Sequence, residues 1–403
     1  MTRSADRQGV PITGMGCITA AGRTLDENLA ALFAGTRAMG PSARVRSSHP
    51  ARYPVFEVAD EALPDGYAAG SECLRCGGLA LVAAAEAIRS AGLGAADLRR
   101  LRVGVCLGTT VGSAMNNEQF YRGFRDGERP DMAAITDFLH ANPSAVVARE
   151  LRLNGPCETV NNACSSGTVA IGQGAEWIRA GVCDVVLAGG TDALCRTVYN
   201  GFISLQIMDE EPVRPFDVRR RGLNLGEGAG VLVLESAASL AARGAQGLGC
   251  LAGYGNAGDA FHVSAPHPEG RSLRTAIETA MGQAGIKTGD LAFINAHGTG
   301  TPENDRVEGQ LYPELLPGVP FLSTKGYTGH TLGASGAIEA AYTLACLRLG
   351  KLPANIGFAE PDPAFPGRPV TATTPVTGNV AISTSLAFGG NNAAVLLAKW
   401  GTP

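Results

Sequence analysis

Short apolar runs rich in β-branched residues alternate along this chain with longer Ala-rich stretches that have helical periodicity. This alternation is typical of strand and helix units built around a largely parallel sheet, so the sequence predicts an α/β fold. Several of the runs are apolar throughout, as expected of strands that helices cover on both faces. The expected strands are 10–18, 103–107, 185–189, 230–234, 292–295, 380–383 and 393–397, and the expected helices are 79–91, 169–180, 273–284 and 336–349.

The composition excludes several classes of protein. Of the 403 residues, 45% are hydrophobic and only 17% are charged, which favours a compact protein over a disordered or coiled-coil one. The formal charge of -4 argues against a nucleic-acid binder that works by bulk charge. No secretory signal pattern opens the chain, and no apolar stretch reaches the roughly 18 residues that a membrane span needs. We therefore expect a cytoplasmic protein that binds neither nucleic acid nor a membrane.

The two parts of the chain show a coarse symmetry. A polar turn of small residues near Cys164 opens an Ala- and Gly-rich helix, and a strand follows; a similar turn near Ser335 opens a second such helix, and another strand follows. Both helices are almost free of charge, so we expect them to be buried. The Gly-rich region 245–256 is the expected join. The predicted division is an N-terminal half, residues 1–248, and a C-terminal half, residues 249–403.

The first candidate for chemistry is Cys164, which stands among small residues where the helix 169–180 is expected to begin. A helix N-terminus stabilises a thiolate through its dipole and its unpaired N–H groups, so this cysteine is a candidate nucleophile. A buried structural cysteine is the alternative, since the chain has ten cysteines and most should be small core residues. Cys73 and Cys76 have the spacing of a metal or redox pair, but no second pair follows.

The second candidate is His297, which directly follows the expected strand 292–295. Active-site groups gather at the carboxyl ends of strands in open α/β sheets. The alternative is an ordinary helix start, with Thr301 or Asn304 as the N-cap and Glu308 in the first turn. Both interpretations can hold together, because a cap would rigidify the loop that aims the histidine.

Two further segments complete the set. Lys325 and His330 lie in a stretch of glycines and hydroxyl residues that leads into the second charge-poor helix. A phosphate-binding loop is the competing interpretation, but the Gly-Lys-Ser/Thr ending of such loops is absent. Near the C-terminus, Gly389 and Gly390 follow Phe388 between two apolar strands, and consecutive glycines allow a ligand to approach the backbone closely. A plain hairpin would explain that turn equally well.

Taken in order, these segments resemble the β-ketoacyl-acyl carrier protein synthase family. The likeness extends over nearly the whole chain. It rests on Ala163-Cys164-Ser165-Ser166-Gly167, on Ala296-His297-Gly298-Thr299-Gly300-Thr301-Pro302, on Thr324-Lys325-Gly326 with Thr328-Gly329-His330, on Phe388-Gly389-Gly390-Asn391-Asn392 and on Arg214-Pro215-Phe216-Asp217.

The resemblance implies a thiolase-like fold, in which two related halves form an α/β/α/β/α layered core, and an acyltransferase that performs decarboxylative Claisen condensation. It also implies the role of each site residue. Cys164 would be the nucleophile, His297 and His330 would stabilise the enolate, and the backbone N–H of Phe388 would complete an oxyanion hole with that of Cys164. Lys325 and Glu308 would support the histidines, Thr299 and Thr301 would bind the pantetheine arm, and Val111 would line the acyl pocket.

The resemblance further implies an acyl carrier protein as partner, whose phosphopantetheine arm takes the place of any permanently bound cofactor; no metal is needed. Because carrier proteins are acidic, we expect a local basic patch. Segment 63–76, which is rich in basic residues in the fatty-acid members, offers only Arg75, and Gln206 stands where an arginine is common. These departures favour type II polyketide or polyene biosynthesis, in a homodimer or in a heterodimer with a chain-length-factor-like subunit.

Three alternatives stay open. Fatty-acid elongation uses the same chemistry. A catalytically silent chain-length-factor-like subunit shares the fold, but such subunits typically lack the cysteine, whereas Cys164, His297 and His330 are all present here. A thiolase generally uses a second cysteine near the C-terminus, and none follows Cys346.

Overall fold

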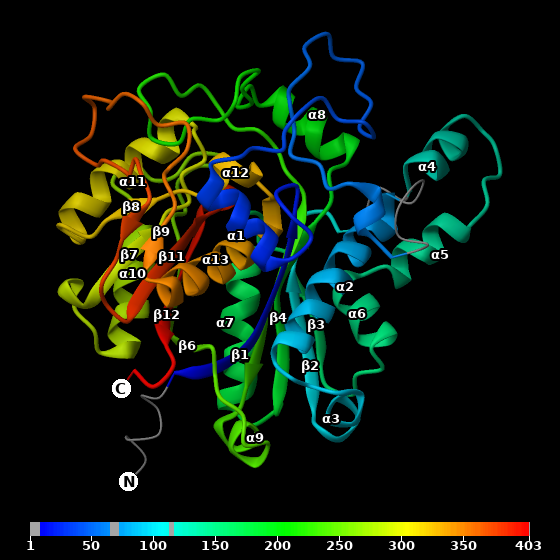
Figure 1. Ribbon diagram of the computed structural model, residues 1–403. Helices are drawn as coiled ribbons and strands as arrows, with labels where there is room; N and C mark the ends of the chain where they lie inside the picture. Colours follow the sequence, from blue (N-terminus) through cyan, green and yellow to red (C-terminus); the bar gives the residue numbers. More distant parts are fainter. Residues whose placement is uncertain (1–8, 65–71, 113–116, 403) are drawn as a thin grey trace.

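The computed structural model describes residues 9–64, 72–112 and 117–402 (Figure 1). In the first half of the chain five strands lie in the order β3-β2-β4-β5-β1. Strand β2 is parallel to both of its neighbours, and β5 is antiparallel to both of its own. These strands are β1 (Val10–Thr19), β2 (Val103–Gly108), β3 (Cys157–Val160), β4 (Val185–Asp192) and β5 (Gly228–Glu235).

The second half repeats this topology. Its five strands lie in the order β8-β7-β11-β12-β6, which is the same order once the strands of each half are counted from one. The directions also match, since β7 is parallel to β8 and β11, and β12 is antiparallel to β11 and β6. The strands are β6 (Gly249–Gly258), β7 (Leu291–Asn295), β8 (Phe321–Leu322), β11 (Val380–Leu386) and β12 (Asn391–Lys399). The expectation of two related halves is therefore confirmed. The expectation of a largely parallel sheet is wrong, because only the pairings made by β2 and β7 are parallel and the others between these strands are antiparallel.

Helices form the other three layers. Helices α7 (Ser166–Arg179) and α13 (Ser335–Leu349) pack on each other between the two sets of strands. Helix α2 (Glu72–Ser90) covers the outer face of the first set, and α10 (Arg271–Ala284) covers the outer face of the second. The resulting α/β/α/β/α core confirms the thiolase-like fold predicted by the resemblance. Both central helices are largely buried, as their lack of charge predicts.

The remaining elements lie around this core. In Figure 1, α4 and α5 project at the right-hand side and α8 lies at the top, beside the loop that follows α1. These elements are α1 (Leu25–Ala34), α3 (Ala95–Arg100), α4 (Glu118–Arg125), α5 (Ala133–His140), α6 (Pro143–Glu150), α8 (Arg196–Ser204), α9 (Ala237–Ala242), α11 (Pro302–Leu315), α12 (Lys325–Thr328), β9 (Lys351–Leu352) and β10 (Thr374–Pro375).

Most of the Gly-rich region 245–256, where the sequence suggests the join, is strand β6, the first strand of the second set. Its glycines serve packing: a Cβ on Gly253 or Gly255 would overlap a backbone carbonyl of α10, so glycine lets the helix approach the strand closely. Strand β6 also pairs with β1 through Val10 to Ile12, which joins the two sets into one hydrogen-bonded array. A domain boundary at 248/249 stays a prediction.

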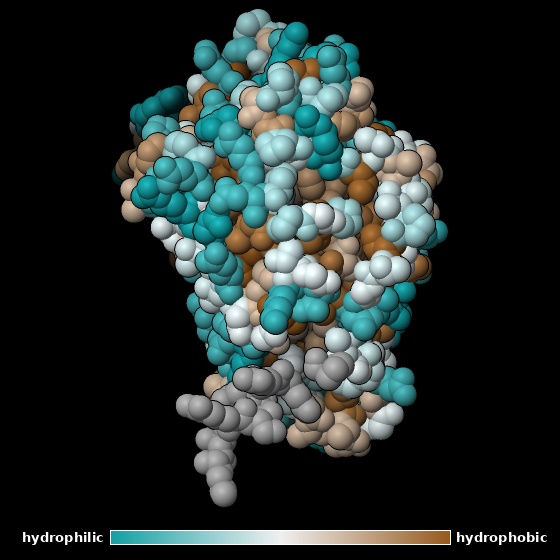
Figure 2. Space-filling view, turned by 90° about the vertical axis from the view of Figure 1, so that its left-hand side faces the viewer, coloured by the Kyte–Doolittle hydropathy of each residue, from teal (hydrophilic) through white to brown (hydrophobic). Residues whose placement is uncertain are grey.

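The outer surface is mixed in character. Figure 2 shows the face on which α10 and α11 lie, where hydrophilic side chains cover most of the surface and hydrophobic ones gather between them in the middle. Among the described residues, no helix combines the length and the apolar character that crossing a membrane requires.

Candidate active site

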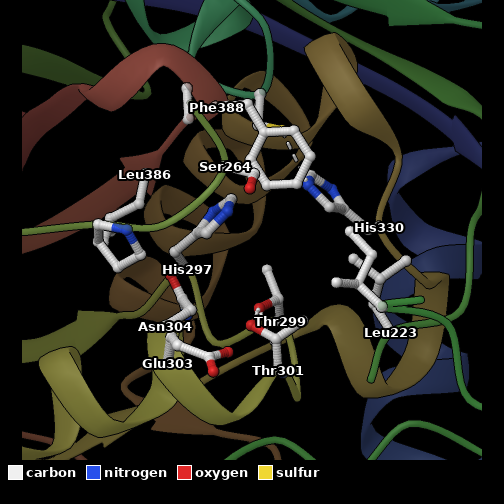
Figure 3. A pocket seen from close by; sticks show the side chains of 14 residues that line it. Leu223, Ser264, His297, Thr299, Thr301, Glu303, Asn304, His330, Leu386 and Phe388 are labelled. Carbon is white, nitrogen blue, oxygen red and sulfur yellow. Dashed lines mark hydrogen bonds between the residues drawn. The ribbon is translucent and has the colours of Figure 1, made fainter. Parts of the chain in front are cut away.

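The four segments that the sequence singles out meet in one cavity of about 60 Å³. Cys164 comes from the turn before α7, His297 from the loop after β7 and His330 from the loop before α13. Figure 3 shows both imidazoles directed into the space between them. The other lining residues are Ile207, Leu223, Ser264, Pro266, Thr299, Thr301, Glu303, Asn304, Leu386, Ala387 and Phe388.

A tight turn between β3 and α7 presents the cysteine. Ala163 has φ 47°, in the left-handed region that a residue with a side chain rarely adopts. The Ser166 hydroxyl accepts the N–H of Asn162 at 2.7 Å and donates to the carbonyl of Ala163 at 2.6 Å, which holds the turn. The Cys164 Sγ then lies 3.1 Å from Nε2 of His330.

Burial raises the pKa of Cys164 to about 11. The backbone N–H of Phe388, the charge of Lys325 and the N–H of Cys164 itself all act in the opposite direction. Desolvation therefore outweighs the stabilisation that the helix start offers to a thiolate, and the thiol of Cys164 is protonated at neutral pH in the protein alone. The same contacts place both predicted oxyanion-hole N–H groups at the sulfur.

Neighbouring donors determine which ring nitrogen of each histidine carries the proton. The N–H of Leu332 donates to Nδ1 of His330 at 3.3 Å, and Nζ of Lys325 lies 3.2 Å from Nδ1 of His297. Because a backbone N–H and an ammonium can only donate, both Nδ1 atoms accept, and the ring proton is on Nε2 in each case. The ring centroids are 5.2 Å apart. Burial, reinforced by the charge of Lys325, lowers the pKa of both rings well below the usual value, so both are neutral.

Lys325 is itself held by a residue that sequence reasoning missed. Its ammonium donates to the carbonyl of His297 at 2.7 Å and to the carboxylate of Glu339, in the middle of α13. Burial raises the pKa of Glu339 to about 7, against the opposing effect of Lys325. The available signal was that Glu339 is the one acidic residue of a helix with little charge, since an acid at such a position is rarely buried without a partner.

The turn at Phe388 closes the site from the other side. It joins the antiparallel strands β11 and β12, so it is both a hairpin and part of the site. The side-chain amide of Asn391 donates to Oδ1 of Asn162 at 2.8 Å, which ties this turn to the one that carries Cys164. The Phe388 ring stacks on Phe202 of α8, with centroids 5.7 Å apart.

Family models agree with this geometry. Residues 7–239 match the family "Beta-ketoacyl synthase, N-terminal domain", and residues 248–359 match "Beta-ketoacyl synthase, C-terminal domain". The chain belongs to the β-ketoacyl synthase family. It is thus a condensing enzyme of the acyltransferase class.

Individual relatives support the assignment. The chain is 32% identical over 416 residues to "3-oxoacyl-[acyl-carrier-protein] synthase 2" of Synechocystis sp., which covers 98% of this chain and 99% of the relative. The solved structure "The ishigamide ketosynthase/chain length factor" superposes with a TM-score of 0.90 at 32% identity, covering 98% of this chain and 100% of the other. A chain of the solved structure "Ketosynthase (ApeO) in Complex with its Chain Length Factor (ApeC) from Xenorhabdus doucetiae" gives a TM-score of 0.85 at 32% identity, covering 99% of this chain and 100% of the other.

In this synthase Glu308 holds the backbone of the histidine loop rather than the imidazole. Its carboxylate accepts the N–H of His297 at 2.8 Å and that of Gly298 at 2.6 Å, and it also accepts the hydroxyl of Tyr312. Glu308 is fully buried, and burial raises its pKa. Thr301 is the N-cap residue of α11, but its side chain accepts no capping bond and Glu308 lies beyond the first turn.

The substrate-binding predictions meet different outcomes. Thr299 and Thr301 both line the cavity, with their hydroxyls 2.9 Å apart. Val111 does not; it lines a separate cavity of about 250 Å³ with Leu139 and Asn161, among others. Its role in an acyl pocket stays a prediction.

The structure also locates Arg75 and Cys76 of segment 63–76. Arg75 is 1% exposed and pairs with Glu227 and Asp60, so it cannot contact a carrier. Cys76 is buried beside Thr191, and the side chain of Cys73 lies outside the described residues. No group of side chains within the described ranges is arranged to hold a metal ion.

Proposed function

We propose that this synthase extends an acyl chain by condensing it with malonyl-acyl carrier protein, with Cys164 as the nucleophile. The observation that carries this proposal is the arrangement of three atoms around one cavity: the sulfur of Cys164 and the two protonated Nε2 atoms of His297 and His330. The name of the Synechocystis relative supports the carrier protein as the form in which the substrate arrives.

In the first step the sulfur of Cys164 attacks the carbonyl carbon of an acyl-carrier thioester. The developing oxyanion would be held by the backbone N–H groups of Cys164 and Phe388, and one such donor contributes about 10²–10³ in rate. The carbonyl then re-forms, the bond to the pantetheine sulfur breaks, and the thiol proton of Cys164 ends on that leaving sulfur. The step is therefore neutral overall and leaves an acyl-cysteine.

In the second step a malonyl thioester enters and loses carbon dioxide. The electron pair of the breaking carbon–carbon bond moves into the thioester carbonyl and forms an enolate. Nε2 of His297 and Nε2 of His330 each donate a proton in a hydrogen bond to that oxygen, which stabilises it without proton transfer. Neutral rings suit this task, because an imidazolium could instead transfer its proton and quench the enolate.

In the third step the enolate carbon attacks the carbonyl of the acyl-cysteine. The same two N–H groups hold the tetrahedral oxyanion, whose collapse breaks the carbon–sulfur bond and releases a β-ketoacyl thioester. Cys164 leaves as a thiolate and takes one proton from solvent. Solvent must supply this proton because the loss of carbon dioxide releases none. Burial of the site raises the pKa of Cys164 and so favours that reprotonation.

The phosphopantetheine arm would arrive on the substrate, so the chain needs no resident cofactor. The hydroxyls of Thr299 and Thr301 lie on one side of the cavity and offer donors and acceptors for the amides of that arm. Lys325 and Glu308 act through His297: one contacts its ring nitrogen, and the other its backbone. A location in the cytoplasm stays a prediction from the sequence.

For the pathway we propose type II polyketide or polyene biosynthesis, with a chain-length-factor-like subunit as partner. Two solved structures in which the matched chain is 32% identical to this one have titles that name a ketosynthase together with a chain length factor. Helices α4 and α5 offer a surface for a second subunit, because Tyr121, Phe124 and Leu139 are each more than 60% exposed. Fatty-acid elongation by a homodimer is the second candidate, and the Synechocystis relative favours it.

The test is a condensation assay with octanoyl- and malonyl-carrier protein, in which the β-ketoacyl product is measured by mass spectrometry. The assay is run on the chain alone and on the chain co-expressed with the adjacent gene product. We expect product from the wild-type protein and none from Cys164→Ala. Product only from the co-expressed pair supports the heterodimer; full activity of a homodimer would overturn that part, and absence of product from both preparations would overturn the proposed function.

A further inference from the structure

The loop after α1 is unusually basic for this chain. Residues 28–56 contain no Asp or Glu, although the whole chain has 37 of them, and they contain four arginines. We call residues 36–54 the arginine loop. Its arginines are Arg37, Arg44, Arg46 and Arg52.

Buried contacts fix this loop beside the active site. Val45, within it, and Val55, just after it, belong to one apolar cluster with Leu223 and Leu332. Leu223 lines the catalytic cavity, and Leu332 donates the backbone N–H that orients His330. The arginine loop is therefore packed against the wall of the cavity.

Hydrogen bonds also tie the loop to α8. The Ser47 hydroxyl donates to Oδ1 of Asn200 at 2.6 Å, and the Tyr199 hydroxyl bonds to both the N–H and the carbonyl of Tyr53, at 2.9 and 3.1 Å. Figure 1 shows the loop, in blue, beside α8 at the top of the molecule. Helix α8 also carries Phe202, which stacks on Phe388 at the cavity. The loop is thus held in place against a helix that reaches the cavity.

The arginines of the loop differ in how their charge is compensated. Arg44 pairs with Glu227 at 2.9 Å and with Glu57 at 3.1 Å. Arg46 and Arg52 are exposed and pair with no acidic side chain of the described residues. Two cations without a described partner therefore stand on a loop that packs against the wall of the cavity.

We propose that the arginine loop is the docking surface for the protein that delivers the thioester, with Arg46 and Arg52 contacting carboxylates on an acidic face of that protein. The inference rests on the proposed function. Arg75, the one basic residue of segment 63–76, is buried in ion pairs and so is not available to bind the carrier. Exposed charges of this kind chiefly raise the association rate and make it depend on salt.

The test compares two acyl donors that differ only in the carrier. Octanoyl-carrier protein needs docking, whereas octanoyl-pantetheine carries the same thioester without a protein. Acylation of Cys164 is followed by intact mass for wild type, R46E/R52E and the milder R46Q/R52Q, each purified with its partner subunit if the two co-purify. R99E/R100E is the matched control, because Arg99 and Arg100 are exposed on α3, at the opposite end of the molecule in Figure 1.

We expect R46E/R52E to lower the acylation rate constant from octanoyl-carrier protein at least about tenfold at low salt. R46Q/R52Q should give a smaller loss in the same direction. The rate from octanoyl-pantetheine should stay unchanged, R99E/R100E should match wild type with both donors, and salt should slow only the proteins that keep Arg46 and Arg52.

Three results would overturn the inference. Loading of R46E/R52E at the wild-type rate from the carrier would exclude docking on this loop. Equal losses with both donors would show a structural role instead. Loss of the co-purifying subunit with unchanged carrier kinetics would assign the loop to that subunit. Failure of the wild-type protein with both donors would refute the proposed function itself, which separates the two conclusions.

Discussion

The buried ion pair between Lys325 and Glu339 offers a quantitative test of the site. The two side chains are 1% and 4% exposed. Removing one partner of such a pair leaves an uncompensated buried charge, which costs about 3–5 kcal/mol, whereas replacing both partners by neutral groups is often nearly free. We therefore expect K325M and E339Q each to lower the free energy of unfolding by about 3–5 kcal/mol, and K325M/E339Q to lose much less than the sum.

The free energy of unfolding of these variants should also change with pH in a defined direction. The pKa of Glu339 is raised from 4.5 to about 7 with Lys325 in place, and without that cation it rises further. Above pH 7, folded K325M then keeps a proton that the unfolded chain has lost. Its free energy of unfolding should therefore fall further below that of wild type as pH rises, by up to about 1.4 kcal/mol per pH unit. Variants with E339Q lack this titration.

The assay is urea denaturation followed by circular dichroism at pH 7, 8 and 9. The matched control is R271M/E269Q, since Arg271 and Glu269 form an ion pair whose side chains are 69% and 66% exposed. That change should alter the free energy of unfolding by no more than about 1 kcal/mol. Additive losses in K325M/E339Q, or single variants as stable as wild type, would refute the reasoning.

Three further predictions concern packing, reactivity and the histidine loop. Gly336→Ala puts a Cβ into the facing helix and should lower the free energy of unfolding by about 1–3 kcal/mol or more in urea titration; wild-type stability would contradict the packing. The rate at which iodoacetamide alkylates Cys164, measured by peptide mass, should rise about tenfold per pH unit from pH 7 to 9, because a pKa of about 11 leaves little thiolate in that range. A rate that reaches a plateau below pH 8 would exclude that pKa. Glu308→Ala removes the acceptor of the His297 N–H and should lower kcat by a larger factor than it changes KM. The kcat of Glu308→Gln should lie between those of Glu308→Ala and wild type. A change in KM alone would argue against this positioning role.

The sequence predicts most of the fold because the periodic signals are strong. The apolar runs at 185–189 and 380–383 become the buried strands β4 and β11, extended by a few residues at their carboxyl ends. Strand β6 was missed because its glycines resemble a linker. They are required instead by the close approach of α10, a constraint set by a helix that lies distant in the sequence.

The site divides in the same way. Cys164, His297 and His330 stand in local motifs, so the sequence predicts them and the structure brings them together. The local pattern marks Glu339 as the one acidic residue of its helix but does not identify its partner, because the contact with Lys325 joins α12 to α13 in the folded protein. The protonation of Cys164 was also out of reach, since the sequence shows the helix start but not the desolvation that outweighs it.

The most direct test of the account is the intact mass of the purified protein after incubation with octanoyl-carrier protein. The account predicts one added octanoyl group on the wild-type chain, located on the peptide that contains Cys164. Cys164→Ala should gain no mass, and subsequent addition of malonyl-carrier protein should remove the acyl group from the wild-type chain as the β-ketoacyl product. Acylation at another residue, or an acyl group that persists after malonyl-carrier protein is added, would contradict it.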